Sequence, residues 1–292
     1  MLLEVKNLIK KYDTIAAVDG ISFSIKEGIC FGLLGPNGAG KTTTIEVIEG
    51  ILPETSGEIL YKGKIRGASF KEEIGIQFQQ TSLLESLTLY ETLKLFKTFY
   101  KNTYELEELT RLCNLEEILH QRNNKVSGGQ RQRLMLSIAL INNPDLLFLD
   151  EPSTGLDPQA RRNLWDIVQT IKSKGKTIVL TTHYMEEAQI LCDEIAIMDH
   201  GKIIAHGTPN DLIKKYCSGI TVILPADSFS FPLDSLSMNH KKIYDRVEIY
   251  TDDINKCLKE LMTRDIDLTE LIVRSPNLED VFLKLTGRHL RN

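Results

Sequence analysis

A run of residues from Gly35 to Thr43 contains the pattern G-x-x-x-x-G-K-[ST], which is typical of loops that bind phosphate. Glycines in such a loop bring backbone N–H groups close to phosphate oxygens, because no Cβ stands in the way. Lys41 offers a compact positive charge to the β- and γ-phosphates of a nucleotide, and the Thr42 hydroxyl can ligate Mg²⁺. We therefore expect nucleotide-binding residues at Gly35, Pro36, Asn37, Gly38, Ala39, Gly40, Lys41, Thr42 and Thr43.

The segments on either side of this loop support that interpretation. Residues 29–34 are an apolar run that predicts a buried parallel strand. Residues 43–48 predict the start of a helix, with Ile45 and Ile48 on one face. A strand, a loop and a helix therefore follow one another, and the N-terminus of the helix adds its own attraction for anions.

Two further apolar strands end in polar side chains. The strand at 146–149 is followed directly by Asp150 and Glu151, and the strand at 177–180 is followed by Thr181, Thr182 and His183. In a parallel sheet, groups that follow the carboxyl ends of the strands meet at one edge. We expect two carboxylates and an imidazole to lie beside the phosphate loop, where Asp150 can reach Mg²⁺ directly or through water.

A second candidate anion site lies at residues 127–130. Ser127, Gly128, Gly129 and Gln130 open a new helix, with Leu134, Ile138 and Ile141 on one of its faces. A serine and two glycines at a helix N-terminus can bind an anion. One nucleotide does not need two such sites from the same chain.

The order of the elements predicts an α/β fold. Apolar strands alternate with amphipathic helices, which favours a mainly parallel sheet, while residues 3–10 and 15–25 read as antiparallel N-terminal strands. A helical subdomain is expected at about residues 80–143, where Thr88 and Glu91 form a capping box and the pattern stays helical to about Leu119. From Thr208 the pattern changes, so we expect a domain at 1–208 and a small α+β domain at 209–292.

Composition limits the classes of protein to consider. The chain has 292 residues, 42% apolar and 26% charged, with a net charge of −5, so no bulk attraction to nucleic acid is expected. No apolar run approaches the ~20 residues that span a bilayer, and no secretory signal is visible. The five cysteines lie far apart without a C-x-x-C pair, so metal binding by thiols is not expected.

The phosphate loop, the Ser-Gly-Gly-Gln segment, the acids at 150–151 and His183, taken in this order, closely resemble the ATP-binding cassette (ABC) ATPases over residues 2–208. The Ser-Gly-Gly-Gln segment is the most specific part of the resemblance. The resemblance implies ATP and Mg²⁺ as cofactors. It also implies head-to-tail pairing of two chains, in which the Ser-Gly-Gly-Gln segment of one protomer contacts the γ-phosphate of the ATP held by the other. A homodimer, or a pair with a homologous ATPase, is therefore expected.

The resemblance also implies a role for each matching residue. Glu151 corresponds to the general base, His183 to the sensor of the γ-phosphate, and Gln79 to the glutamine that senses Mg²⁺ and water. Asp157 lies in the loop that communicates across the dimer. Tyr12 corresponds to the aromatic residue that stacks on adenine, although its position in an early hairpin also fits a half-buried strand residue. The expected catalytic residues are thus Glu151, His183 and Gln79, and the expected metal ligands are Thr42, Gln79 and Asp150.

The C-terminal region, which ends in Pro276-Asn277-Leu278-Glu279-Asp280, resembles that of ATPase subunits of bacterial drug exporters, including the daunorubicin-resistance type. This resemblance implies an ATPase that drives a separate membrane permease, which exports drugs or other amphiphiles. The chain is then expected to be cytoplasmic and peripheral on the inner face of the cell membrane, where the permease holds it. Two alternatives remain: an ABC ATPase that acts on DNA, ribosomes or cofactor assembly, and a nucleotide-binding regulator without turnover. The second cassette, the long coiled coils and the zinc-binding cysteines of the first class are not visible, and Glu151 and His183 argue against the second.

Overall fold

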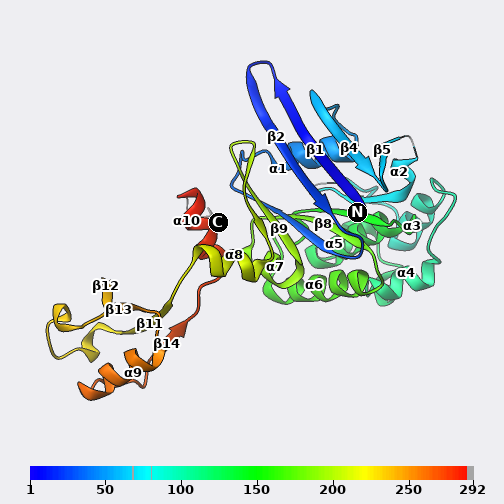
Figure 1. Cartoon of the computed structure of the whole chain (residues 1–292). Coiled ribbons are helices and arrows are strands. Elements are labelled where there is room, and N and C mark those ends of the chain that lie inside the picture. The colour runs from blue at the N-terminus through cyan, green and yellow to red at the C-terminus, as the bar shows by residue number, and fades with distance from the viewer. Residues whose placement is uncertain (68, 80, 288–292) are drawn as a thin grey trace. The chain divides into compact units, whose positions relative to one another are not determined.

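The computed structural model describes residues 1–67, 69–79 and 81–287. These form two compact units, one of residues 1–209 and one of residues 210–287 (Figure 1). Within these described ranges, none of the helices combines the length and the apolar character that a membrane span needs.

The first unit contains two sheets. One is antiparallel, in the order β2-β1-β4-β5, and the other has six strands in the order β10-β9-β3-β8-β7-β6, parallel except for the pairing of β10 with β9. The parallel strands β3, β7 and β8 are almost wholly buried, because other elements of the same unit pack against both faces of the sheet. The strands span β1 Leu3–Tyr12, β2 Ile15–Ile25, β3 Cys30–Leu34, β4 Ser56–Tyr61, β5 Lys64–Ile65, β6 Ile74–Gln77, β7 Leu146–Asp150, β8 Thr177–Thr182, β9 Glu194–Asp199 and β10 Lys202–Gly207. The mixed sheet and the antiparallel N-terminal sheet confirm the predicted α/β class.

Helix α1 lies between the two sheets. Its apolar residues Ile45, Val47 and Ile48 share one core with residues of β1, β2 and β4 on one side and β3 and β7 on the other. The helices of this unit are α1 Lys41–Glu49, α2 Phe70–Glu73, α3 Leu89–Lys97, α4 Leu106–Leu112, α5 Gly128–Leu140, α6 Pro158–Ser173, α7 Met185–Leu191 and the start of α8 Pro209–Tyr216, with 3₁₀ turns at Glu116–Ile118 and Asn123–Lys125. Because α1 begins directly after the phosphate loop, burial of this helix fixes the loop to the sheet.

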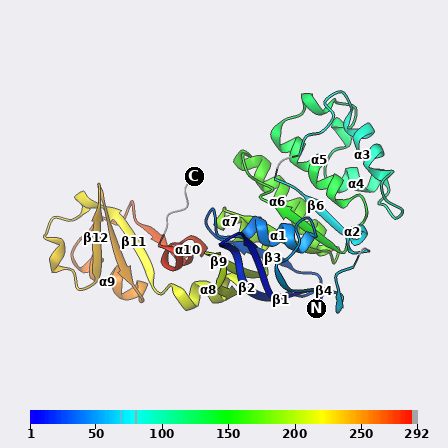
Figure 2. The ribbon, with the colours of Figure 1, turned by 90° about the horizontal axis from the view of Figure 1, so that it is seen from above.

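The helical segment at 88–119 is less continuous than predicted. The capping box is confirmed: Thr88 Oγ1 accepts from Glu91 N at 3.2 Å, and Thr88 N donates to Glu91 Oε2 at 2.8 Å. The helix stops at Lys97, and a second helix begins only at Leu106. The apolar stripe continued through Tyr100, so periodicity did not reveal this break. Together, α3, α4 and α5 lie on one side of the first unit (Figure 2).

The second unit is an antiparallel sheet in the order β12-β13-β11-β14, with helices. Its strands are β11 Ile220–Pro225, β12 Asn239–Ile243, β13 Arg246–Thr251 and β14 Ile272–Arg274; its helices are the rest of α8, α9 Ile254–Thr263 and α10 Leu278–Thr286, with 3₁₀ turns at Ala226–Ser228 and Leu233–Ser235. Val222, Leu224, Val247 and Ile249 from the sheet and Cys257 and Leu261 from α9 form its core. Strand β12 was not predicted, because its sequence Asn-His-Lys-Lys-Ile lacks the alternation of a half-buried strand.

Gly75 sets how closely α5 packs on β6. A Cβ at this position would lie 1.9 Å from the carbonyl oxygen of Ala139, a backbone atom that cannot move independently. We expect Gly75→Ala to lower the free energy of unfolding by about 1–3 kcal/mol or more, as overpacked cores do. Chemical denaturation of the two variants Gly75→Ala and Gly67→Ala is the measurement, since a Cβ at Gly67 would meet no atom within 4 Å. Equal stabilities of the two variants would contradict the close packing.

Candidate active site

The phosphate loop is held by close backbone contacts that only glycine permits. Gly40 has φ +100°, and a Cβ there would lie 2.2 Å from the carbonyl oxygen of Ala17 in β2. Gly40 is also the N-cap of α1, and its carbonyl accepts hydrogen bonds from Thr44 N at 2.9 Å and Thr44 Oγ1 at 2.8 Å. The loop therefore leads into a helix whose first turn carries Lys41 and an exposed Thr42.

Lys41 is buried and turned onto the loop. Its side chain donates to the carbonyl oxygen of Gly35 at 2.8 Å and to that of Pro36 at 3.3 Å. Burial lowers the pKa of Lys41, while the negative charges of Glu151 and Asp150 act in the opposite direction. The electrostatic influence of these acids agrees with the prediction that they lie at the same edge of the sheet.

Three side chains converge on one carboxylate oxygen, Oε2 of Glu151. Gln79 Nε2 donates to it at 3.0 Å, Thr154 Oγ1 donates to it at 3.2 Å, and His183 Nδ1 lies 3.2 Å away. Glu151 has a positive φ of 47°, and its backbone N–H is held by Thr181 at the end of β8. The structure thus brings together Gln79, Glu151 and His183, three residues that come from three different segments.

The two adjacent acids differ in their environments. Burial raises the pKa of Asp150, although a hydrogen bond from Thr181 Oγ1 opposes this effect. The hydrogen bond with His183 is the main reason that the pKa of Glu151 is lowered, even though burial acts against it. Neighbouring carboxylates with pKa values moved in opposite directions are typical of sites where the two acids have different tasks.

Ser127 and Gln130 form a second capping box, at the start of α5. Ser127 Oγ accepts from Gln130 N at 3.3 Å, and Ser127 N donates to Gln130 Oε1 at 2.8 Å. A Cβ on Gly129 would lie 2.8 Å from that of Ala160, whose N–H is capped by Asp157 Oδ1 at 2.8 Å. The Ser127–Gln130 segment therefore packs against the start of α6. In the part of the chain that the structure describes, no hydrogen bond joins this segment to the phosphate loop.

Tyr12 ends β1 at the tip of the first hairpin. Tyr12 is 45% exposed, and Lys10 Nζ lies over its ring, 5.1 Å from the ring centroid. Among the described contacts, none joins Tyr12 to the phosphate loop. An exposed aromatic ring leaves a face free for stacking, but its role stays a prediction.

The oxygen atoms of Thr42, Asp150 and Gln79 fit Mg²⁺ better than a softer metal. Within the described residues, no cluster of three or more His, Cys, Asp or Glu side chains could hold a metal ion. Mg²⁺ is usually held by one or two protein oxygens, with phosphate oxygens and water completing the shell. An exposed hydroxyl beside the loop and a carboxylate at a strand end are a donor set of that kind.

Thr154 and Thr181 are residues that sequence reasoning did not single out. Thr154 bonds Glu151, and Thr181 bonds Asp150. Both were visible only as polar neighbours of the expected site, Thr154 in the turn after Glu151 and Thr181 at the end of a strand. Their contacts depend on how the loop after β7 folds back beside β8, which no local pattern reveals.

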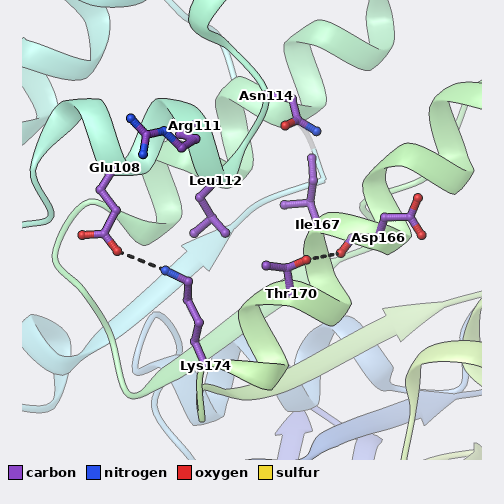
Figure 3. Close-up of a pocket in the computed structure, with 8 residues that line it drawn as sticks. All are labelled: Glu108, Arg111, Leu112, Asn114, Asp166, Ile167, Thr170 and Lys174. Atoms are coloured by element: carbon purple, nitrogen blue, oxygen red, sulfur yellow. Dashed lines mark hydrogen bonds and ion pairs between the residues drawn. The ribbon is translucent and has the colours of Figure 1, made fainter.

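A pocket of about 560 Å³ lies between α4 and α6 (Figure 3). Glu108 and Lys174, which both line the pocket, form an ion pair of 3.0 Å, and Leu112 and Ile167 are among its apolar residues. None of the predicted site residues lines this pocket. Because both partners of the ion pair are substantially exposed, the pair contributes little to stability.

Comparison with known proteins agrees with this geometry. Residues 18–154 match the family model described as "ABC transporter", and residues 234–287 match the "Nodulation factor export protein NodI, C-terminal domain". The "Linearmycin resistance ATP-binding protein LnrL" of Bacillus subtilis is 36% identical, with the whole of both chains covered. The chain belongs to the ATP-binding subunits of ABC transporters. Its relationship to export ATPases, expected from the C-terminal region, is confirmed.

Other members of the ABC family are also similar to this chain in sequence or in structure. The "Nod factor export ATP-binding protein I" of Ralstonia nicotianae is 37% identical over all of this chain and 95% of its own. Among solved structures, an "ATP binding subunit of ABC transporter" is 32% identical with a TM-score of 0.66, covering 74% of this chain and 93% of its own. The ABC cassette MJ0796, in a dimeric structure bound to ADP and Pi, is 27% identical with a TM-score of 0.64, covering 71% of this chain and 98% of its own.

Glu49, at the end of α1, provides a pH-dependent test of the electrostatics in this ABC ATPase. Burial, together with the charges of Asp150 and Glu46, raises the pKa of Glu49 from 4.5 to about 8. Between these two pH values the folded chain holds a proton that the unfolded chain has lost, so stability falls as the pH rises. We expect Glu49→Gln to raise the melting temperature at pH 8 and to have a shrinking effect toward pH 4.5. Thermal melts across this range, with the exposed Glu27→Gln as control, measure the effect; a constant difference at all pH values would refute it.

Proposed function

We propose that this chain hydrolyses ATP to drive a separate membrane permease, as an exporter subunit. The main support is the convergence of Gln79, Thr154 and His183 on Glu151 Oε2. At the same edge of the sheet, the negative charges of Glu151 and Asp150 act to raise the pKa of Lys41. A regulator that only binds nucleotide does not need a carboxylate prepared in this way. A relative named for Nod factor export favours transport over the non-transport alternatives.

The chemistry assigned to these residues is a displacement at the γ-phosphorus of ATP. The backbone N–H groups of the loop at 35–41, apart from Pro36, which has none, and the Lys41 ammonium hold the phosphates, and Tyr12 stacks on adenine. Glu151 accepts a proton from water as the water oxygen attacks phosphorus and the bond to the leaving oxygen of ADP breaks. The hydrogen bond with His183 lowers the pKa of Glu151 and so favours the ionised carboxylate. Gln79 and His183 orient this carboxylate and the transferred phosphoryl group. Mg²⁺, held by Thr42, Asp150 and Gln79, would offset the charge of the phosphates.

Pairing of two chains explains the second anion site. Ser127 and its glycines carry the N-terminal amides of α5, yet no hydrogen bond of the described residues links them to their own phosphate loop. A head-to-tail dimer would place each Ser127 segment over the ATP held by the other chain, with Asp157 beside it. The related cassette MJ0796 has a dimeric structure bound to ADP and Pi, which supports the pairing of two chains. ATP would then close the dimer, and its hydrolysis would open it.

The permease has a candidate contact surface on the first unit. Between residues 78 and 99, in the loop after β6, on α3 and directly after α3, five large apolar residues of the described chain are substantially exposed: Phe78, Leu84, Tyr90, Leu95 and Phe99. Exposed apolar residues that gather in one segment are typical of protein–protein contacts. This segment begins one residue before Gln79, so a permease bound here would sense the state of the ATP site. The permease would hold the chain at the inner face of the membrane.

Replacing the general base tests the assignment of Glu151. Glu151→Gln keeps the size of the side chain but removes the proton acceptor. We expect turnover to fall by at least about 100-fold, since general bases contribute ~10²–10⁴-fold, while ATP binding and ATP-dependent dimerisation remain. Steady-state ATPase assays and light scattering with ATP are the measurements, and exposed Glu186→Gln is the control. Turnover in Glu151→Gln equal to that of the control would exclude Glu151 as the base.

Replacing Lys41 tests the phosphate loop. Lys41→Ala removes the ammonium that faces the β- and γ-phosphates, so the Kd for ATP should rise by at least about tenfold, as expected for loss of a charge-assisted hydrogen bond of ~1.5–3 kcal/mol. Titration with a fluorescent ATP analogue gives the Kd. The variant Lys26→Ala, at an exposed lysine paired with Glu194, is the control. An unchanged Kd in Lys41→Ala would contradict the loop assignment.

A further inference from the structure

Gln77 is a buried polar residue at the end of β6 that the fold does not require. Gln77 is 1% exposed and pairs with the apolar residue Leu149 of the neighbouring strand β7. Its Nε2 donates to Gln132 Oε1 of α5 at 2.8 Å, and its own Oε1 has no partner among the described residues. A buried acceptor left without a hydrogen bond costs about 1–3 kcal/mol. A leucine of similar size would avoid this cost, so the amide calls for another explanation.

The hydrogen bond joins two segments that the proposed mechanism assigns to different ATP sites. Gln77 lies two residues before Gln79, which bonds Glu151 Oε2. Gln132 lies two residues after Gln130, which closes the cap with Ser127. A path of short covalent and hydrogen-bonded steps therefore leads from the general base to the Ser127 cap.

A second contact runs parallel to the first. Arg131 Nη2 donates to the carbonyl oxygen of Thr81 at 2.7 Å, in the loop that follows Gln79. The other end of α5 is fixed to the start of β6, where Asn142 Nδ2 donates to the carbonyl oxygen of Ile74 at 2.8 Å. Between these points α5 packs directly on Gly75. Because the far end of the helix is held tightly, a displacement of the Gln79 loop acts on the first turn of α5, where the cap is.

We infer that Gln77 and Gln132 are positioning residues that couple the two ATP sites of the dimer. The inference rests on the proposed function: in a head-to-tail pair, Gln79 and Glu151 serve the ATP in their own loop, while Ser127 of the same chain serves the ATP of the other. ATP bound at one site would order Gln79. Through the hydrogen bond between Gln77 and Gln132, this ordering would fix the position of the Ser127–Gln130 capping box, which contacts the ATP at the other site. Such coupling appears as cooperativity between the sites.

The test measures ATPase rate against MgATP concentration for the full-length chain. Wild type is expected to show a Hill coefficient between 1 and 2. Gln77→Leu and Gln132→Leu should bring it close to 1 and lower the rate at limiting MgATP by at least about fivefold, the lower end of typical coupling factors. The rate at saturating MgATP should change less. Gln132→Glu keeps an acceptor for Gln77 Nε2 and should retain the wild-type curve.

Stability separates positioning from a structural role. Gln77→Leu removes a half-satisfied amide, so its melting temperature should equal or exceed that of wild type. A lower melting temperature with an unchanged Hill coefficient would overturn the inference, as would a Gln132→Glu variant as impaired as Gln132→Leu. A wild-type Hill coefficient of 1 in a chain that still dimerises with ATP would overturn the coupling alone. Absence of any ATP-dependent dimer would overturn the proposed function and this inference with it.

Discussion

The site depends on keeping two neighbouring carboxylates ionisable beside a loop built for a highly charged anion. Glu151 is held by three donors on one oxygen, whereas Asp150 is bonded by Thr181 and is more affected by burial. Lys41 is the nearby buried cation that offsets these charges. A nucleotide that approaches this edge brings further negative charge, which must be balanced by the loop amides, the helix N-terminus and a divalent ion. Much of the surrounding fold can be understood as the means of holding these donors in place.

Local sequence patterns predicted the elements that carry this chemistry. The apolar runs at 29–34, 146–149 and 177–180 are three buried strands of one sheet, and their polar followers meet at one edge because parallel strands share a direction. The capping box at Thr88 was predicted because it depends on residues three positions apart. The box between Ser127 and Gln130 has the same spacing, but only the helix start and its anion site were predicted there. The assignment of Gln79 and Tyr12 relied on the family resemblance, since neither position has a local signal of its own.

Features that depend on packing were not readable from the sequence. The break between α3 and α4 falls in a segment whose apolar spacing still fits a helix. Strand β12 is polar because it is an edge strand, and it was identified only through its pairing with β13. The hydrogen bond between Gln77 and Gln132 joins residues 55 positions apart, and neither residue differs in type from the many exposed glutamines of ordinary helices and strands. Such contacts are set by the placement of α5 on β6.

In the proposed dimer, each chain supplies its phosphate loop to one ATP and its Ser127 segment to the other. Mixing two inactive variants tests this most directly. Lys41→Ala impairs the phosphate loop. Ser127→Asp keeps a good helix N-cap but places a negative charge against the γ-phosphate of the ATP bound to the other chain. A mixed dimer holds one site that combines both defects and one site free of either. We expect each variant alone to be nearly inactive and an equimolar mixture to regain ATPase activity, up to about a quarter of the wild-type rate if chains pair at random and sites act independently. A mixture no more active than its two components would contradict it.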